Sequence, residues 1–153
     1  MGDLYDWLLF GHILGAMVWL GGLVALALLG IRARRSGDDG TIARFVGGLR
    51  VVGPAVLAPS AGLVVALGLG MVFDSAAWDF GQTWVQLALG VLVAAVVIGA
   101  AYLSRVGIAA ERAVQAGDHV EAARQLGRWS WGIGAILLLL LVATWDMVFK
   151  PGV

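Results

Sequence analysis

The 153-residue sequence contains no cysteine and few charges, since Asp, Glu, Lys and Arg together make up 13% of it. Without cysteine the chain cannot form disulfides, zinc–thiolate sites, iron–sulfur clusters or the covalent link of a c-type haem. The formal net charge is zero, so no overall field attracts nucleic acid, and no nucleic-acid partner is expected. A phosphate-binding loop and the patterns typical of hydrolytic catalysis are also missing, which leaves open whether the protein is an enzyme.

The chain instead has an excess of apolar residues. Hydrophobic residues make up 61% of the sequence, compared with roughly 45–50% in soluble domains. The mean hydropathy is +0.93. A chain this short cannot bury so much apolar surface against itself, and a disordered chain has the opposite composition. Soluble globular and disordered proteins are therefore excluded.

Four stretches without formal charge predict membrane spans: residues 7–31, 51–73, 80–104 and 129–145. At about 1.5 Å per residue the first three can cross a hydrocarbon core of about 30 Å, and the fourth can lengthen at both ends. Backbone hydrogen bonds must close within each span, which requires helices. We predict an all-α integral membrane protein, an antiparallel four-helix bundle. One domain covers residues 1–153, with helices at about 5–31, 51–73, 80–115 and 119–150.

The basic residues predict how the bundle is oriented. Nine of the ten lie in the two connections that follow the first and third spans; they are Arg32, Arg34, Arg35, Arg44, Arg50, Arg105, Arg112, Arg124 and Arg128. The positive-inside rule places both connections in the cytoplasm and both termini outside. Asp3 and Asp6 precede the first span where a signal peptide would carry positive charge, so this span is expected to remain in the mature protein.

Small residues recur at four-residue spacing within the spans, a pattern that lets membrane helices approach closely. The sets are Gly11 with Gly15, Gly62 with Ala66 and Gly70, and Ala95 with Gly99. They favour tight packing within the bundle; an oligomer contact and a gap shaped for a cofactor are the alternatives. Pro54 and Pro59 are expected to kink or loosen the start of the second span.

His12 is the strongest candidate for a functional residue, because ionisable groups at membrane depth are rare and usually functional. On its helix face it is followed by Gly15, Ala16 and Gly22, which leave space, and by the flat ring of Trp19. This pattern suits a planar cofactor that is ligated by His12 and walled by Trp19. The alternative is a neutral histidine that is hydrogen-bonded to another helix.

The second histidine, His119, lies in the predicted cytoplasmic connection before the last helix, and it is expected to be a solvated surface residue. The two histidines therefore lie on opposite sides of the membrane and cannot both ligate one haem within a single chain. A bis-histidine haem would need two copies of His12 across a dimer; otherwise the second ligand is of another type.

Other polar or soft side chains gather near the outer end. Asp146 and Lys150 are four residues apart with the acid first, which predicts a favourable helical ion pair. Met71 and Met147 also end spans on this side, and with His12 they could form a copper(I) entry site. The alternative for both methionines is gap filling.

Two segments carry a resemblance to a known family. The run LFGHILGAMVWLGG at residues 9–22 and the tail WDMVFKP at 145–151 resemble the bacterial integral membrane family called domain of unknown function 2269 (DUF2269). That family is similar to the copper-resistance D (CopD) membrane domain and to the HemJ-type protoporphyrinogen oxidases. The resemblance implies a protein of the bacterial plasma membrane. HemJ-type proteins bind haem b through a first-helix histidine, matched by His12, and a lysine early in the third helix, where Gln86 stands.

Three hypotheses about function follow. The first is a protein that binds haem b or a porphyrin, for electron transfer or porphyrin handling, with His12 as metal ligand and Gly15, Trp19 and Gln86 as further cofactor-binding residues. The second is transport of copper or a small solute. The third is a structural subunit of a larger membrane complex. The expected partners are the lipid bilayer and either further copies of the chain or such a complex.

Overall fold

In the computed structural model, which describes residues 3–152, nearly all of the chain is helical. The helical elements form four long rods. The first is α1 (Leu4–Ser36). The second joins α2 (Asp39–Val52), the π-helical segment η1 (Gly53–Leu57) and α3 (Ala58–Asp74). The third joins α4 (Thr83–Val97), the π-helical segment η2 (Ile98–Leu103) and α5 (Ser104–Gln115). The fourth is α6 (His119–Phe149).

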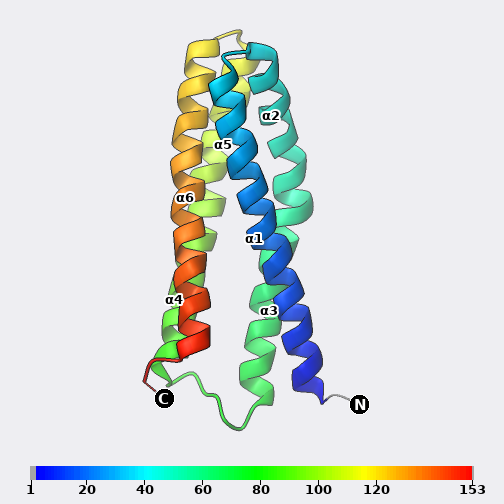
Figure 1. The fold of residues 1–153 in the computed structure, drawn as a ribbon, viewed down its shortest axis with the longest axis vertical. Helices are drawn as coiled ribbons and strands as arrows, with labels where there is room; N and C mark the ends of the chain where they lie inside the picture. The colour runs from blue at the N-terminus through cyan, green and yellow to red at the C-terminus, as the bar shows by residue number, and fades with distance from the viewer. Residues whose placement is uncertain (1–2, 153) are drawn as a thin grey trace.

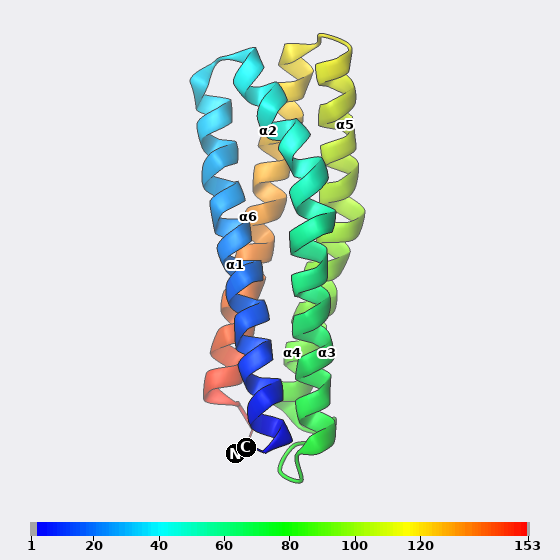
Figure 2. The ribbon, with the colours of Figure 1, turned by 90° about the vertical axis from the view of Figure 1, so that its right-hand side faces the viewer.

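The four rods run antiparallel in a bundle (Figures 1 and 2). Each is long and apolar enough to cross a membrane. Both chain ends lie at one end of the bundle together with the loop between α3 and α4, and we call this the terminal end. The short connections at 37–38 and 116–118 lie at the other, arginine-rich end. The expectation of an all-α four-helix membrane bundle is confirmed.

The first connection is much shorter than predicted, because residues 32–36 and 39–50 are helical. α1 continues to Ser36 and ends at Gly37, whose φ of 64° is a left-handed conformation that favours glycine. α2 then begins after Asp38, whose carboxylate accepts a hydrogen bond of 2.7 Å from the backbone N–H of Thr41. Hydropathy marks where the membrane ends rather than where the helix ends, so the helices continue beyond the predicted spans. The third rod begins at Thr83 rather than at residue 80.

The start of α6 is capped by one side chain. Asp118 accepts a hydrogen bond of 2.9 Å from the backbone N–H of Glu121. The Glu121 carboxylate does not return to Asp118. It binds the guanidinium of Arg124 and the amide of Gln125, at 2.7 and 2.6 Å. The reciprocal hydrogen bond of a capping box, from the Asp118 backbone to the Glu121 carboxylate, is therefore not formed.

Both middle rods widen into a π-helix halfway along their length. Pro54 has no backbone N–H to donate, and η1 absorbs this loss without breaking the rod. Just after η2 the hydroxyl of Ser104, the first residue of α5, donates to the carbonyl of Gly99 at 3.2 Å, a contact that competes with the regular helical hydrogen bonds. The predicted proline kink is thus a local change of helical pitch, and the third rod has a matching one without proline.

The helices pair differently in the two halves of the bundle. Near the arginine-rich end α1, α2, α5 and α6 all pack together, and the rings of Phe45 and Trp129 meet edge to face at 5.5 Å. At the terminal end α3 packs on α1 and α4 packs on α6, while α3 makes no comparable contact with α4 or α6 (Figure 1). No residue of 65–74 is buried. The core is therefore closed at the arginine-rich end and divided into two helix pairs at the terminal end.

Glycines bring α1 and α3 together. A methyl group placed on Gly11 would lie 2.8 Å from the side chain of Leu67, and one placed on Gly15 would lie 3.1 Å from Val64. These two small residues pack as predicted. Gly62 does not, because nothing lies within 4 Å of a methyl group at this position, and both Gly62 and Ala66 are exposed.

Candidate functional site

His12 lies between α1 and α3 near the terminal end and is 8% exposed. Its Nδ1 is 2.9 Å from the backbone carbonyl oxygen of Val64. The ring rests against Gly68, where a methyl group would lie 3.1 Å from Cε1 and 3.3 Å from Nδ1 of the imidazole. Gly68 therefore opens the surface of α3 to the ring. The sequence pattern drew attention to Gly62 and Gly70 on this helix and missed Gly68, since only a cross-helix contact reveals its role.

The hydrogen bond of His12 fixes which ring nitrogen is free. A carbonyl oxygen only accepts, so Nδ1 carries the hydrogen and donates it to Val64. In the neutral ring Nε2 then carries a lone pair, and it makes no hydrogen bond within residues 3–152. Metal-binding histidines have this arrangement, in which one nitrogen donates to a carbonyl or carboxylate and the other binds the metal.

The space expected beside His12 on its own helix face is filled. The side chain of Val64 packs on Gly15, and a methyl group at Gly22 would lie 2.9 Å from Leu57. Trp19 is a buried member of the hydrophobic core. The prediction of an open wall along α1 was therefore wrong, because small residues on a membrane helix attract a neighbouring helix as readily as they leave room for a ligand.

Asp146 on α6 is the second buried ionisable residue at the terminal end, and none of its surface is exposed. Its two carboxylate oxygens are the only buried side-chain nitrogen or oxygen atoms in the described chain without a hydrogen-bond partner. Buried polar groups are almost always paired, because an unpaired one costs about 1–3 kcal/mol. Asp146 is therefore an exception that calls for an explanation.

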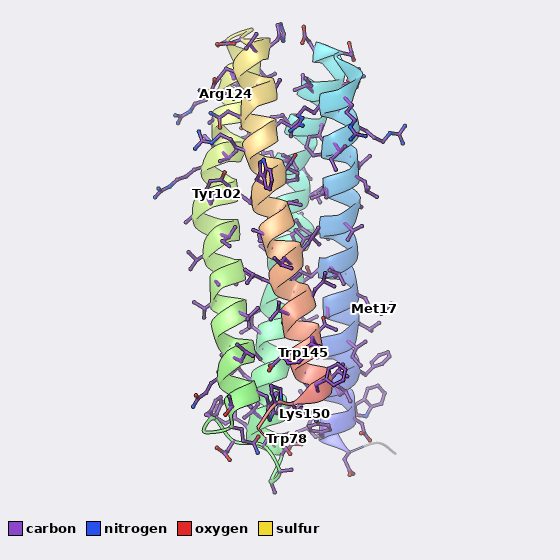
Figure 3. The ribbon with its side chains drawn as sticks, turned by 60° about the vertical axis from the view of Figure 1, so that its left-hand side comes forward. Met17, Trp78, Tyr102, Arg124, Trp145 and Lys150 are labelled. Carbon is purple, nitrogen blue, oxygen red and sulfur yellow. The ribbon has the colours of Figure 1, made fainter. Side chains whose placement is uncertain are left out.

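The predicted ion pair between Asp146 and Lys150 is not formed. The ammonium of Lys150 lies 3.8 Å from the ring centre of Trp78 and 5.5 Å from that of Trp84 (Figure 3). Lys150 ends α6 at a φ of 44°, a left-handed conformation that directs the chain away from the helix. Trp78 also donates to the hydroxyl of Tyr5 at 3.3 Å. Lys150 thus contacts an aromatic cluster and forms no ion pair with Asp146.

His12 and Asp146 lie at a similar depth. α1 and α6 run antiparallel, and two contacts fix their register: Gly30 meets the ring of Trp129, and Gly127 meets Arg34. Asp146 lies 17 residues after Trp129 on α6. Because α1 runs the other way, Asp146 is level with the residue 17 positions before Gly30, which is residue 13. The same count from the contact between Gly127 and Arg34 gives residue 15. Asp146 is therefore level with residues 13–15, within one helical turn of His12.

Comparison with known proteins identifies the family of this chain. The model of a family described as predicted integral membrane protein (DUF2269) matches residues 6–151. The chain belongs to the DUF2269 family. No curated protein matches it. No solved structure matches it. The matched region includes both His12 and Asp146, whereas a relation of this DUF2269 protein to the CopD and HemJ-type families stays a prediction.

The remaining candidate residues of this DUF2269 protein lie apart from His12. Gln86 is exposed on α4 and donates to the carbonyl of Phe80 at 3.1 Å, and α4 packs on α6 rather than on α1. Met147 is 36% exposed, whereas its neighbour Asp146 is buried. His119 lies at the arginine-rich end and its side chain is half exposed, as predicted. Neither Gln86 nor His119 contacts the imidazole, whose only hydrogen bond within the described chain is to Val64.

Proposed function

We propose that this membrane protein binds haem b near the terminal end, with Nε2 of His12 as an axial ligand of the iron. The observation that carries the proposal is the hydrogen bond from Nδ1 to the Val64 carbonyl, which orients the ring and leaves Nε2 with a free lone pair. Gly68 supports this orientation, because any larger residue would push the ring away from the carbonyl.

We expect such a group to lie between the two helix pairs of the terminal end. The α1–α3 interface is filled by Val64 and Leu57, so a flat ring system does not fit there. Between the α1–α3 and α4–α6 pairs, α3 makes no comparable contact with α4 or α6, and the two pairs meet through α1 and α6. The carboxyl of Asp146 lies at this depth and has no hydrogen-bond partner among the described residues.

Bound haem iron would supply one-electron transfer, tuned by its axial ligand and its surroundings. The chain's own residues have simpler tasks. His12 would ligate the iron through Nε2, while Val64 and Gly68 hold its ring in one orientation. The apolar side chains of the surrounding helices keep water away from the site. An electron-transfer role follows more directly from this arrangement than porphyrin oxidation, for which the chain offers no second ligand at Gln86.

The distribution of buried polar groups favours haem binding over transport. Among the described residues the buried polar or charged side chains are His12, Ser60, Gln125 and Asp146. Ser60 donates to a carbonyl of its own helix, and Gln125 binds Glu121 near the arginine-rich end. A path for copper or a small solute needs polar groups through the middle of the bundle, where the core is apolar.

The haem proposal predicts a visible spectrum that depends on His12. We expect the protein, purified in mild detergent from cells supplied with a haem precursor, to show a Soret band that sharpens and shifts on reduction with dithionite. In His12→Ala the band should be lost or fall at least tenfold, because the axial ligand is gone. Imidazole added to this variant should restore part of the band.

The matched control is His119→Ala, which removes the exposed histidine and should keep the full band. Gly68→Ala should weaken the band, since the new methyl group displaces the imidazole, whereas Gly62→Ala should not. A wild-type protein without any band after haem supplementation would overturn the proposal, and so would a band that His12→Ala retains in full.

We also infer that the arginine-rich end faces the cytoplasm of a bacterium, supported by the nine basic residues of this end. Because the chain has no cysteine, single cysteines report their side directly. In intact spheroplasts a membrane-impermeant maleimide should label a cysteine at Ala77 and leave one at Gly37 unlabelled until the membrane is opened. The reverse pattern would show the opposite orientation.

A further inference from the structure

A cleft of about 280 Å³ lies between the ends of α1 and α6 near the arginine-rich end. Its lining consists of Ile31, Arg34, Arg35, Gly127, Ser130 and Trp131. This cleft lies on the lipid-facing side of the bundle, far from His12, and the proposed haem site does not use it. It combines positive charge with an exposed aromatic ring.

The charge in this cleft is not balanced locally. Arg34 and Arg35 form no ion pair with any residue of 3–152, and the lining contains no acidic side chain. A larger cleft of about 550 Å³ between α5 and α6 differs in this respect, because Asp118 and Glu121 line it together with two arginines. The smaller cleft is therefore the one that presents uncompensated guanidinium groups to an anion.

Gly127 forms the floor that holds Arg34. A methyl group at this position would lie 3.1 Å from Nη1 of Arg34, so the guanidinium rests on the backbone of α6. This contact places the guanidinium beside the helix, while Arg34 as a whole remains exposed. A guanidinium held in this way is preorganised for a phosphate, which it can bind through two parallel hydrogen bonds.

Trp131 adds an apolar contact on the membrane side of the two arginines. Its side chain is 81% exposed, and it lies four residues from Gly127 toward the middle of α6. Ile31 on α1 is also exposed beside the cleft. Indole rings at the headgroup level are typical of membrane interfaces, where one edge contacts acyl chains. A ligand that touches both parts of this cleft must carry an anionic group and a hydrocarbon chain.

We propose that this cleft binds an anionic glycerophospholipid. Its phosphate binds Arg34 and Arg35, and the part of an acyl chain nearest the glycerol packs against Trp131. The arginines lie at the end of the bundle, where headgroups surround them, and the indole lies where the acyl chains begin. Free inorganic phosphate would use the guanidinium groups but gain nothing from the indole.

Native mass spectrometry of the whole protein in detergent tests this site. We expect added phosphatidylglycerol to give a retained one-lipid complex and phosphatidylcholine a much weaker one. The double variant Arg34→Ala/Arg35→Ala should bind phosphatidylglycerol at least tenfold more weakly, and Trp131→Ala should also weaken it. The control is Arg32→Ala/Arg105→Ala, which removes the same charge outside this cleft and should bind as the wild type does.

Three outcomes would overturn the proposal. Equal loss in both double variants would show that total charge matters rather than this cleft. Equal binding of the two lipids would remove the need for an anionic headgroup. Full competition by millimolar inorganic phosphate, together with unchanged binding in Trp131→Ala, would identify a phosphate site that has no preference for lipid.

Discussion

Gly132→Ala is expected to destabilise the protein by about 1–3 kcal/mol, the range for inserting a methyl group into a tightly packed site. Gly132 is where α6 crosses η2. A methyl group there would lie 2.5 Å from Leu103 and 2.8 Å from the ring of Tyr102. Tyr102 has little freedom to move away, because its hydroxyl donates to the carbonyl of Arg128 at 3.2 Å. Thermal unfolding in detergent, followed by tryptophan fluorescence, measures the effect.

Gly134→Ala, on the same helix, is the matched control. Nothing lies within 4 Å of a methyl group at Gly134, which is exposed. This change should leave stability unchanged or raise it by about 0.5–1 kcal/mol, because alanine favours a helix more than glycine does. If both variants unfold alike, the close approach of α6 to η2 does not limit stability.

Asp146→Leu is expected to stabilise the protein without haem by about 1–3 kcal/mol. Leucine branches at the same carbon as aspartate and replaces the two unpartnered oxygens with methyl groups, which removes the cost of burying them. The extra volume offsets part of this gain. Thermal unfolding of haem-free protein gives the size of the effect.

The control for Asp146 is Asp74→Leu at the exposed end of α3, which should change stability by no more than about 0.5 kcal/mol. Loss of stability in haem-free Asp146→Leu would contradict the expectation and show that the carboxyl already has a partner. Stabilisation would agree with a polar group retained for function at a cost in stability.

The sequence was sufficient to predict the number, order and approximate place of the membrane helices, because long uncharged runs and arginine clusters reflect the bilayer directly. It did not predict α2, whose charged residues lie beyond the membrane while their backbone remains helical. The π-helical segment η2 was also missed, since it depends on how Ser104 and Gly99 share hydrogen bonds.

At the candidate site the sequence identified His12 but described its surroundings incorrectly. The spacing of Gly15 and Gly22 cannot distinguish a gap from a helix contact, and Val64 and Leu57 decide the question from α3. Asp146 was predicted to pair with Lys150 because four-residue spacing places the two side chains on one face. The competing partner, Trp78, comes from a distant loop, so only the tertiary structure reveals that the acid is left alone.

The two π-helical segments have a mechanical consequence. η1 and η2 lie where the closely joined half of the bundle gives way to the two separate pairs. A wide helical turn shifts the face that follows it, so each middle rod can meet one set of neighbours on one side of the turn and another set beyond it. The two turns mark the boundary between these two parts of the bundle. A flat molecule that enters sideways from the lipid would separate the α1–α3 pair from the α4–α6 pair at the terminal end. The four helices packed together at the arginine-rich end would stay unchanged.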